Sequence, residues 1–274
     1  MTPGLRLHDA AWSEAEIVRF YLRERRRVED LYDSERAILE PSLVPCRSVL
    51  DVGCAAGGFS EILAALKPGL RYAGVDAAPA MVEAARRRYP ALRFDVSEGG
   101  TLAFEDGAAD LVLCTSVLHH NPDYEAMIRE CYRVCRIGCV LDLPRLIRRP
   151  YAFDPATSFM RLDQRFEAGD APWTVPYVLC NPQPMFSFLA EGLRPRPRMV
   201  AAVGYDGQPD PSVVIPSRPV CFCVAYLRKG DPHTTRTRLF LEMPPDIVEP
   251  LRLDGVEWLR GDRAALSRFI SEDS

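Results

Sequence analysis

Apolar residues between positions 48 and 143 form short runs, and helical patterns separate several of these runs. Strands are expected at residues 48–52, 71–75, 92–95, 110–114 and 137–143, and helices at 58–66, 79–89 and 123–135. Short apolar strands that alternate with helices are typical of a parallel sheet covered on both faces. The pattern therefore predicts a doubly wound α/β core.

The residues before this core show a helical pattern. Between positions 13 and 40, charged residues separate apolar residues at helical spacing, which predicts one amphipathic helix or two. These apolar residues are Ile17, Tyr21, Val28, Leu31 and Ile38. We expect Pro41 and Pro45 to end the helical segment, because proline disrupts a helix interior. Residues 1–45 are thus predicted to be an N-terminal helical cap.

The pattern after residue 143 is weaker. A helix is expected near residues 184–191 and strands at 199–203 and 220–227, within a stretch rich in proline and aromatic residues. The two strands are joined by roughly fifteen residues without a helix, which favours an antiparallel pair. We predict a main domain at 46–230, an insertion that shapes the substrate site at about 144–197, and a C-terminal extension at 231–274. The extension is expected to hold a strand at 236–241, a turn at 254–255 and a helix at 262–270.

Composition limits the class of protein. The chain has 274 residues, of which 47% are hydrophobic and 26% charged, as in ordinary globular proteins. No apolar run reaches the ~20 residues that span a bilayer, and the first residues resemble no secretion signal. We expect a soluble, cytoplasmic protein with no membrane partner. The net charge of -4 argues against a nucleic-acid partner; a homo-oligomer is compatible with the sequence.

Nine cysteines are present, and several lie in apolar stretches. We expect buried free thiols, because the predicted compartment is reducing. Cys131, Cys135 and Cys139 fall on a helix end and the following strand, and their spacing differs from that of zinc sites. No bound metal is expected.

A loop rich in small residues follows the first predicted strand, with the pattern Asp51-x-Gly53-x-Ala55-x-Gly57. Such a loop allows a ligand to approach the backbone closely, next to the N-terminus of a helix. The spacing Gly53-x-Ala55-x-x-Gly58 also fits a loose dinucleotide pattern, so the loop alone leaves the ligand open. Asp76 ends the second strand, where a carboxylate accepts hydrogen bonds from two ribose hydroxyls. Asp95 ends the third strand and is a candidate acceptor for an adenine amino group.

Together these features resemble the class I S-adenosylmethionine-dependent methyltransferases. The segments that carry the resemblance are Asp51–Gly58, Gly74-Val-Asp-x-x-Pro-x-Met81, Phe94-Asp-Val96, Asp110-Leu-Val112 and Ser116-Val-Leu-His-His-Asn-Pro-Asp123. The last is similar to the small-molecule branch typified by ubiquinone biosynthesis. The resemblance covers about residues 48–143 and implies a Rossmann-like seven-stranded fold.

The resemblance also implies a cofactor, S-adenosyl-L-methionine, with S-adenosyl-L-homocysteine as product. Gly53, Ala55 and Gly57 would lie against its methionine part and Thr115 against the methionyl end. Asp76 would hold the ribose. The complete set of implied cofactor-binding residues is Asp51, Gly53, Ala55, Gly57, Asp76, Ala77, Met81, Asp95, Val96 and Thr115. Ala55 departs from the family, which usually has glycine there.

Methyl transfer requires alignment of a nucleophile with the methyl group and exclusion of water. His119 and His120 are candidate general bases, because imidazole titrates near neutral pH. The alternative, which we favour, is that one packs or caps a helix and the other shapes the pocket.

Arginines cluster after the fifth strand, among them Arg145 and Arg149. They are candidates for binding an anionic group of the acceptor, although a solvated arginine-rich surface is the simpler interpretation. Aromatic residues of the insertion suggest an apolar wall over the carboxyl edge of the sheet, while some of them are expected to be core residues: Trp173, Tyr177, Phe186 and Phe188.

Two other functions stay open at this point. One is an NAD(P)-dependent oxidoreductase, against which Asp95, the Leu-His-His segment and the predicted antiparallel last strand argue. The other is a non-catalytic protein that retains the fold for binding, for which Ala55 and the unfamiliar C-terminal extension argue.

Overall fold

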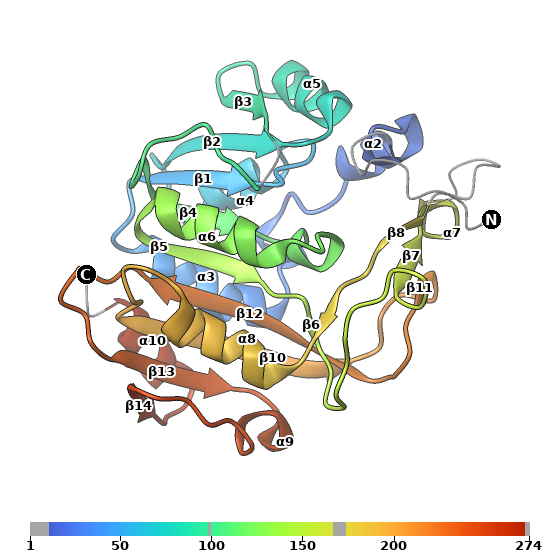
Figure 1. Ribbon diagram of the computed structural model, residues 1–274. Coiled ribbons are helices and arrows are strands. Elements are labelled where there is room, and N and C mark those ends of the chain that lie inside the picture. The colour runs from blue at the N-terminus through green and yellow to red at the C-terminus, as the bar shows by residue number, and fades with distance from the viewer. Residues whose placement is uncertain (1–10, 98–99, 167–173, 272–274) are drawn as a thin grey trace.

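Five parallel strands form the centre of the molecule (Figure 1). The structure is a computed structural model and describes residues 11–97, 100–166 and 174–271. The five strands are β1 (Ser48–Val52), β2 (Arg71–Asp76), β3 (Arg93–Val96), β4 (Ala109–Cys114) and β5 (Cys135–Asp142). They lie in the order β3-β2-β1-β4-β5 with parallel pairing throughout. The predicted doubly wound core is confirmed. The order in which strands are added to the sheet reverses between β1 and β4, which is where such folds bind ligands.

Two later strands extend this sheet. β12 (Val220–Arg228) lies antiparallel to β5, and β10 (Met199–Gly207) lies antiparallel to β12. The predicted antiparallel pair is therefore confirmed. The strands β3-β2-β1-β4-β5-β12-β10 make up the predicted seven-stranded sheet.

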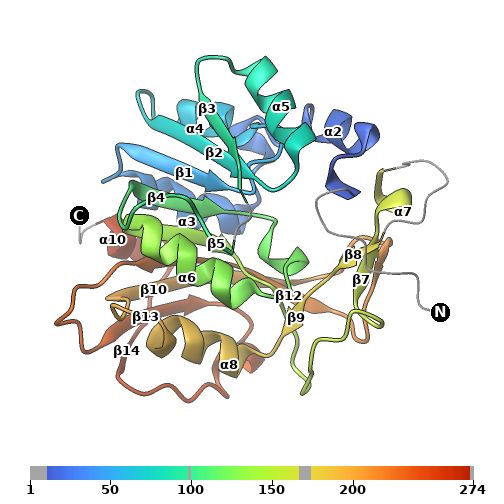
Figure 2. The ribbon, with the colours of Figure 1, turned by 45° about the horizontal axis from the view of Figure 1, so that its top comes forward.

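Helices cover both faces of the sheet (Figure 2). α6 (Tyr124–Val134) and α8 (Pro182–Ser187) pack on one face, and α3 (Asp33–Leu43) and α4 (Phe59–Leu66) on the other. α5 (Pro79–Arg88) packs over β2 and β3. Successive side chains of a strand point to opposite faces, so Val112 of β4 lies in the first core and Leu111 in the second. This two-sided burial explains the continuous apolar runs of the sequence.

In the described part of the N-terminal segment, a short 3₁₀ turn joins two helices. These elements are α2 (Ala15–Tyr21), η1 (Val28–Asp30) and α3. The prediction that Pro41 ends the helix was wrong, because α3 continues to Leu43. Ile38, Leu39 and Leu43 are buried against the sheet, and this burial offsets the hydrogen bond that the proline cannot donate.

The C-terminal residues add to the sheet beyond the seven predicted strands. β13 (Thr237–Glu242) pairs parallel to β10, and β14 (Val256–Leu259) pairs parallel to β13. α9 (Pro245–Val248) lies between these strands in the chain, and α10 (Arg263–Ser271) packs on α3. Leu266 and Ile270 of α10 are fully buried, so these residues are integral to the described core.

A small second sheet stands beyond the carboxyl ends of the central strands (Figure 1). Its strands, in order, are β11 (Val213–Val214), β7 (Phe159–Arg161) and β8 (Thr174–Pro176). Nearby in the chain are β6 (Arg145–Leu146), α7 (Leu162–Phe166), β9 (Leu179–Cys180) and the single π-helical turn η3 (Phe188–Gly192). None of the helices in the described part of the chain has the length and apolar character needed to cross a membrane.

All nine cysteines are free and buried. Cys131, Cys135 and Cys139 belong to the core on one face of the sheet. Within the described residues no three potential metal ligands come together.

Candidate active site

A cavity of about 640 Å³ lies at the carboxyl ends of the central strands, next to β1 and β4, where the strand order reverses. Residues that follow β1, β4 and β5 line one side. The segment between α2 and α3, part of the small sheet and the start of β12 line the other. Eight of the residues predicted from the sequence line it: Asp51, Gly53, Ala55, Thr115, His119, His120, Arg145 and Tyr177.

The loop after β1 has an unusual backbone. Gly53 and Gly57 have φ angles of 78° and 82°, in the left-handed region that glycine adopts readily. A Cβ atom at Gly53 would also lie 2.2 Å from Val117. Asp76 holds this loop, because its Oδ2 accepts from the amide of Ala55 at 2.8 Å and its Oδ1 from that of Ala78 at 2.9 Å. The loop is thus fixed by the end of the neighbouring strand.

Backbone strain is concentrated around the cavity. Among the described residues, three that are not glycine have left-handed φ angles: Arg25 at 54°, Ala55 at 46° and Ser116 at 60°. All three line the cavity. Such conformations cost about 1–3 kcal/mol each and gather at functional sites. Their common location marks this cavity as the site.

Acidic residues end the three strands on one side of the cavity. Asp51 is 2% exposed and accepts a hydrogen bond from the hydroxyl of Tyr72 at 2.7 Å. Burial raises the pKa of Asp51 to about 7. Asp95 is partly exposed and forms ion pairs with Arg86 and Arg93. These carboxylates form a row along the tips of β1, β2 and β3.

The other predicted cofactor-binding residues do not line the cavity itself. Met81 is 1% exposed, and Val96 is 51% exposed at the end of β3. The complete set that lies beside or outside the cavity is Gly57, Asp76, Ala77, Met81, Asp95 and Val96.

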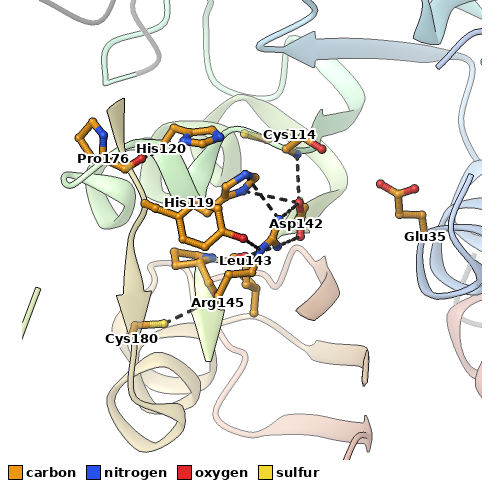
Figure 3. Close-up of polar contacts among 12 residues, drawn as sticks. Glu35, Cys114, His119, His120, Asp142, Leu143, Arg145, Pro176 and Cys180 are labelled. Atoms are coloured by element: carbon orange, nitrogen blue, oxygen red, sulfur yellow. Dashed lines mark hydrogen bonds and ion pairs between the residues drawn. The ribbon is translucent and has the colours of Figure 1, made fainter. Parts of the chain in front are cut away.

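A buried ion pair stands on the other side (Figure 3). Asp142 ends β5, and its Oδ1 accepts from Nη1 of Arg145 at 2.6 Å. Oδ2 accepts from Nη2 of Arg145 at 3.3 Å and from the amide of Ser116 at 3.2 Å. Burial alone would lower the pKa of Arg145, but Asp142 raises it above the ordinary value. The carboxylate of Asp142 thus compensates the buried guanidinium of Arg145.

The two histidines differ in their hydrogen bonds. Nδ1 of His120 lies 2.8 Å from the carbonyl oxygen of Pro176. Because a carbonyl only accepts, Nδ1 carries the proton and Nε2 carries the lone pair in the neutral ring. Nε2 of His119 lies 3.5 Å from Nη2 of Arg145, which only donates, so the lone pair of His119 faces Arg145. Burial, with Arg145 and His120 nearby, lowers the pKa of His119 well below its ordinary value.

The segment between α2 and α3 closes the remaining side through a second buried pair. Nη2 of Arg25 donates to both carboxylate oxygens of Glu35 at 2.7 Å. Glu35 is 3% exposed, and burial raises its pKa although Arg25 opposes the shift. Arg26, the next residue, pairs with Glu61 of α4 at 2.7 Å. These contacts attach the N-terminal segment to the rim of the cavity.

Residues 50–141 match the family model described as a methyltransferase domain. The match includes the strained loop, the acidic strand ends and both histidines of the site. This segment is therefore similar to methyltransferase domains.

Curated relatives also match the chain. A trans-aconitate 2-methyltransferase of Variovorax paradoxus is 31% identical over 165 residues, or 60% of this chain and 59% of that protein. A ubiquinone biosynthesis O-methyltransferase of Xanthomonas oryzae pv. oryzae is 39% identical over 110 residues, which are 38% of this chain and 45% of that protein. The alignments thus span about half of these relatives' own lengths.

Solved structures share the fold. The N-terminal domain of EvdMO1, with SAH bound, has a TM-score of 0.51 and 16% identity over 72% of this chain and 80% of that chain. An S-adenosylmethionine-dependent methyltransferase of Thermotoga maritima, described as a possible histamine N-methyltransferase, has a TM-score of 0.50 and 16% identity. The match covers 81% of this chain and 99% of that chain. The Rossmann-like fold of class I methyltransferases, predicted from the sequence, is confirmed.

The structure brings residues to the cavity that sequence reasoning did not select. Asp142 is a lone carboxylate at the end of an apolar strand, which is the same signal that identified Asp76. No motif in the sequence indicated that Glu35 and Phe222 line the cavity. They belong to α3 and β12, which are distant in the sequence from the loop after β1.

Two predictions about the acceptor side need correction. Arg149 lies outside this cavity, and its exposed side chain donates to the carbonyl oxygen of Pro216. Phe186 and Phe188 pack in the core on one face of the sheet, because α8 and η3 lie on that face. Of the expected aromatic wall, Tyr177 lines the cavity, and Trp173 lies outside the described residues.

Proposed function

We propose that this chain transfers a methyl group from S-adenosyl-L-methionine to a small-molecule acceptor. The observation that carries the proposal is one cavity with a strained small-residue loop on one side and His120, Asp142 and Arg145 on another. A cofactor on the loop and an acceptor near His120 would share this one cavity. A shared cavity aligns the two reactants for transfer.

The residues present fit this cofactor. Small residues with left-handed φ angles let a ligand approach the backbone closely just before α4 begins. Acidic residues end three neighbouring strands, as an extended ligand with several hydrogen-bond donors requires. When bound, the cofactor would supply an electrophilic methyl group on its sulfonium.

We assign the cofactor residues by this geometry and by the family pattern. Asp51 would accept from the ammonium group, and Gly53, Ala55 and Gly57 would lie along the methionine part with Thr115. Asp76 would hold the ribose, because its carboxylate ends β2 and already accepts from the amides of Ala55 and Ala78 in this region. The adenosine end is assigned to Ala77, Met81, Asp95 and Val96.

We assign proton removal to His120, and to His119 a positioning role. The hydrogen bond from Nδ1 of His120 to Pro176 directs the basic Nε2 to the other side of the ring. The lone pair of His119 already faces Arg145. His119 would therefore orient Arg145 and His120 rather than accept a proton.

The alternatives of an oxidoreductase and of a non-catalytic binding protein are not favoured. Calorimetric titrations with S-adenosylhomocysteine and with NADH separate all three. A methyltransferase binds the first ligand and not the second, and an oxidoreductase shows the reverse. Failure to bind S-adenosylhomocysteine at millimolar concentration would overturn the proposal.

The remaining expectations are a cytoplasmic location, no nucleic-acid partner and compatibility with a homo-oligomer. The net charge of -4 supports the second expectation.

A further inference from the structure

Three arginines line the cavity: Arg25, Arg145 and Arg165. An arginine in a substrate pocket usually suggests an anionic substrate. We propose instead that the acceptor carries hydrogen-bond donors and no negative charge, so that it is an alcohol, a phenol or an amine rather than a carboxylate or a phosphate. This inference rests on the proposed function and names the acceptor class of the same site.

Arg145 has no donor left for an acceptor. A guanidinium has five N–H donors. Nε donates to the hydroxyl of Tyr177 at 3.2 Å, and Nη1 donates to Asp142 at 2.6 Å and to the carbonyl of Leu143 at 3.2 Å. Nη2 donates to Asp142 at 3.3 Å and faces His119 at 3.5 Å. An incoming carboxylate would have to break one of these contacts in a site where Arg145 is 6% exposed.

One face of the Arg145 guanidinium is also covered by an aromatic ring. Its Cζ lies 4.6 Å from the centroid of the Phe222 ring, and Phe222 stacks on Tyr205 with the centroids 5.5 Å apart. A guanidinium held between a carboxylate and an aromatic ring is compensated by both. Arg145 thus builds the wall of the cavity.

The other two arginines each pair with a carboxylate and lie against aromatic rings, although Nε of Arg25 has no hydrogen-bond partner. Arg25 pairs with Glu35 and lies over the rings of Tyr32 and Phe59, 5.3 and 5.0 Å from their centroids. Arg165 pairs with Asp210 at 3.3 Å and lies over Phe20 and Phe166. Each arginine that lines the cavity therefore has its own carboxylate.

The carboxylates retain unused acceptor capacity. Asp142 and Glu35 line the cavity from different elements, and Glu35 points toward Asp142 from α3 (Figure 3). Oδ1 of Asp142 accepts from Arg145, and Oε1 of Glu35 accepts from Arg25. Each of these oxygens has a second lone pair. The carboxylates of this wall therefore retain the capacity to accept hydrogen bonds from a bound molecule, whereas the positive charges that an anion would need are already paired.

Three probes with a common 4-hydroxyphenyl ring test the inference on the full chain: tyramine, 4-hydroxybenzyl alcohol and 4-hydroxybenzoate. Affinities are measured by ligand-observed NMR titration with S-adenosylhomocysteine present, and again without it. We expect the acid to bind about tenfold more weakly than the amine, a ratio that one unfavourable charge contact produces. Because the order is also measured without S-adenosylhomocysteine, its outcome is separate from failure of the proposed function.

Two substitutions release an arginine for anion binding. Asp142→Asn and Asp210→Asn should each tighten binding of 4-hydroxybenzoate about tenfold. Asp210 is half-exposed, so this variant serves if Asp142→Asn fails to fold. Asp246→Asn is the matched control, because Asp246 pairs with Arg148 outside the cavity.

The inference is supported by the expected order in wild type, or by acid binding that appears only in Asp142→Asn and Asp210→Asn when the wild-type affinities are too weak to measure. It is overturned if wild type binds the acid as tightly as the amine. It is also overturned if neither variant gains affinity for the acid.

Discussion

Ala55 is strained where it lies. Its φ of 46° is in the left-handed region, and the predicted cofactor loop depends on that conformation. The cost for an L-residue there is about 1–2 kcal/mol. Glycine would remove this cost, but it would also raise the conformational entropy of the unfolded chain, which cancels part of the gain. The departure from the family's glycine is thus tolerated at a small energetic cost.

We predict that Ala55→Gly raises the free energy of unfolding by up to about 1 kcal/mol and preserves binding of S-adenosylhomocysteine. Chemical denaturation measures the first effect. The control is Ala56→Gly, since Ala56 is buried and has no left-handed φ angle, so this variant should lose stability. A loss of stability in Ala55→Gly would contradict the strain argument.

Asp51 links stability to pH. Its folded-state pKa of about 7 exceeds the ordinary value of 3.8 because the side chain is buried. Between these pH values the folded protein binds more protons than the unfolded chain. Stability therefore falls as the pH rises from about 4 to about 7.

Asp51→Asn removes this dependence. At pH 8 the variant should be more stable than wild type, by up to about 4 kcal/mol from the full shift, and it should bind S-adenosylhomocysteine more weakly. Denaturation curves at pH 4 and pH 8 test this, with the pH 4 comparison as the control. If the free energies of unfolding of Asp51→Asn and wild type differed by the same amount at both pH values, burial of the Asp51 carboxylate would not destabilise the fold, and the prediction would be contradicted.

His120 is predicted to carry its proton on Nδ1. Two-bond ¹H–¹⁵N NMR spectra of the imidazoles, assigned with His119→Gln and His120→Gln, report this tautomer directly. Once an acceptor is identified, His120→Gln should lower turnover by about 10²–10⁴-fold without changing affinity for S-adenosylhomocysteine. A proton found on Nε2, or full turnover in His120→Gln, would remove the base assignment.

At the level of elements, the parallel pairing of the central strands could be predicted from the sequence, because helical segments separate several of the apolar runs. The helix-free connection likewise predicted the antiparallel β10 and β12. The parallel pairing of β13 with β10 could not be predicted in this way. It depends on contacts between residues far apart in the chain, among them α10 against α3.

The element that closes the cavity is the segment between α2 and α3. Glu35→Ala would leave Arg25 largely buried without its carboxylate, so we expect a loss of about 2–4 kcal/mol in the free energy of unfolding and weaker binding of S-adenosylhomocysteine. Glu40→Ala is the matched control on the same helix, because the Glu40–Arg36 pair is exposed. Denaturation curves that show equal losses in both variants would contradict a closing role for the buried pair.

For the whole molecule, the two sides of the cavity differ in how far the sequence predicts them. The family model covers residues 50–141, and this segment contains the loop, Asp51 and both histidines. Motif spacing therefore located the proposed cofactor side. Arg145, Glu35 and Phe222 lie outside that segment, and their roles follow from ion pairs and stacking that motif spacing does not encode.

This division also explains why the arginines pointed to an anionic acceptor. Sequence reasoning recognised Arg145 but not Asp142, which neutralises it from three residues away. Charges that compensate each other across a cavity become visible only when the fold brings them together.

The dissociation constant of S-adenosylhomocysteine, measured by calorimetry for wild type and for Asp76→Ala, tests the central claim most directly. Asp76 both holds the loop and is proposed to accept from the ribose. Loss of about two hydrogen bonds to a charged group should weaken binding by at least about tenfold. The account predicts a micromolar wild-type constant that is lost or strongly weakened in the variant. No binding by wild type, or equal binding by both proteins, would contradict it.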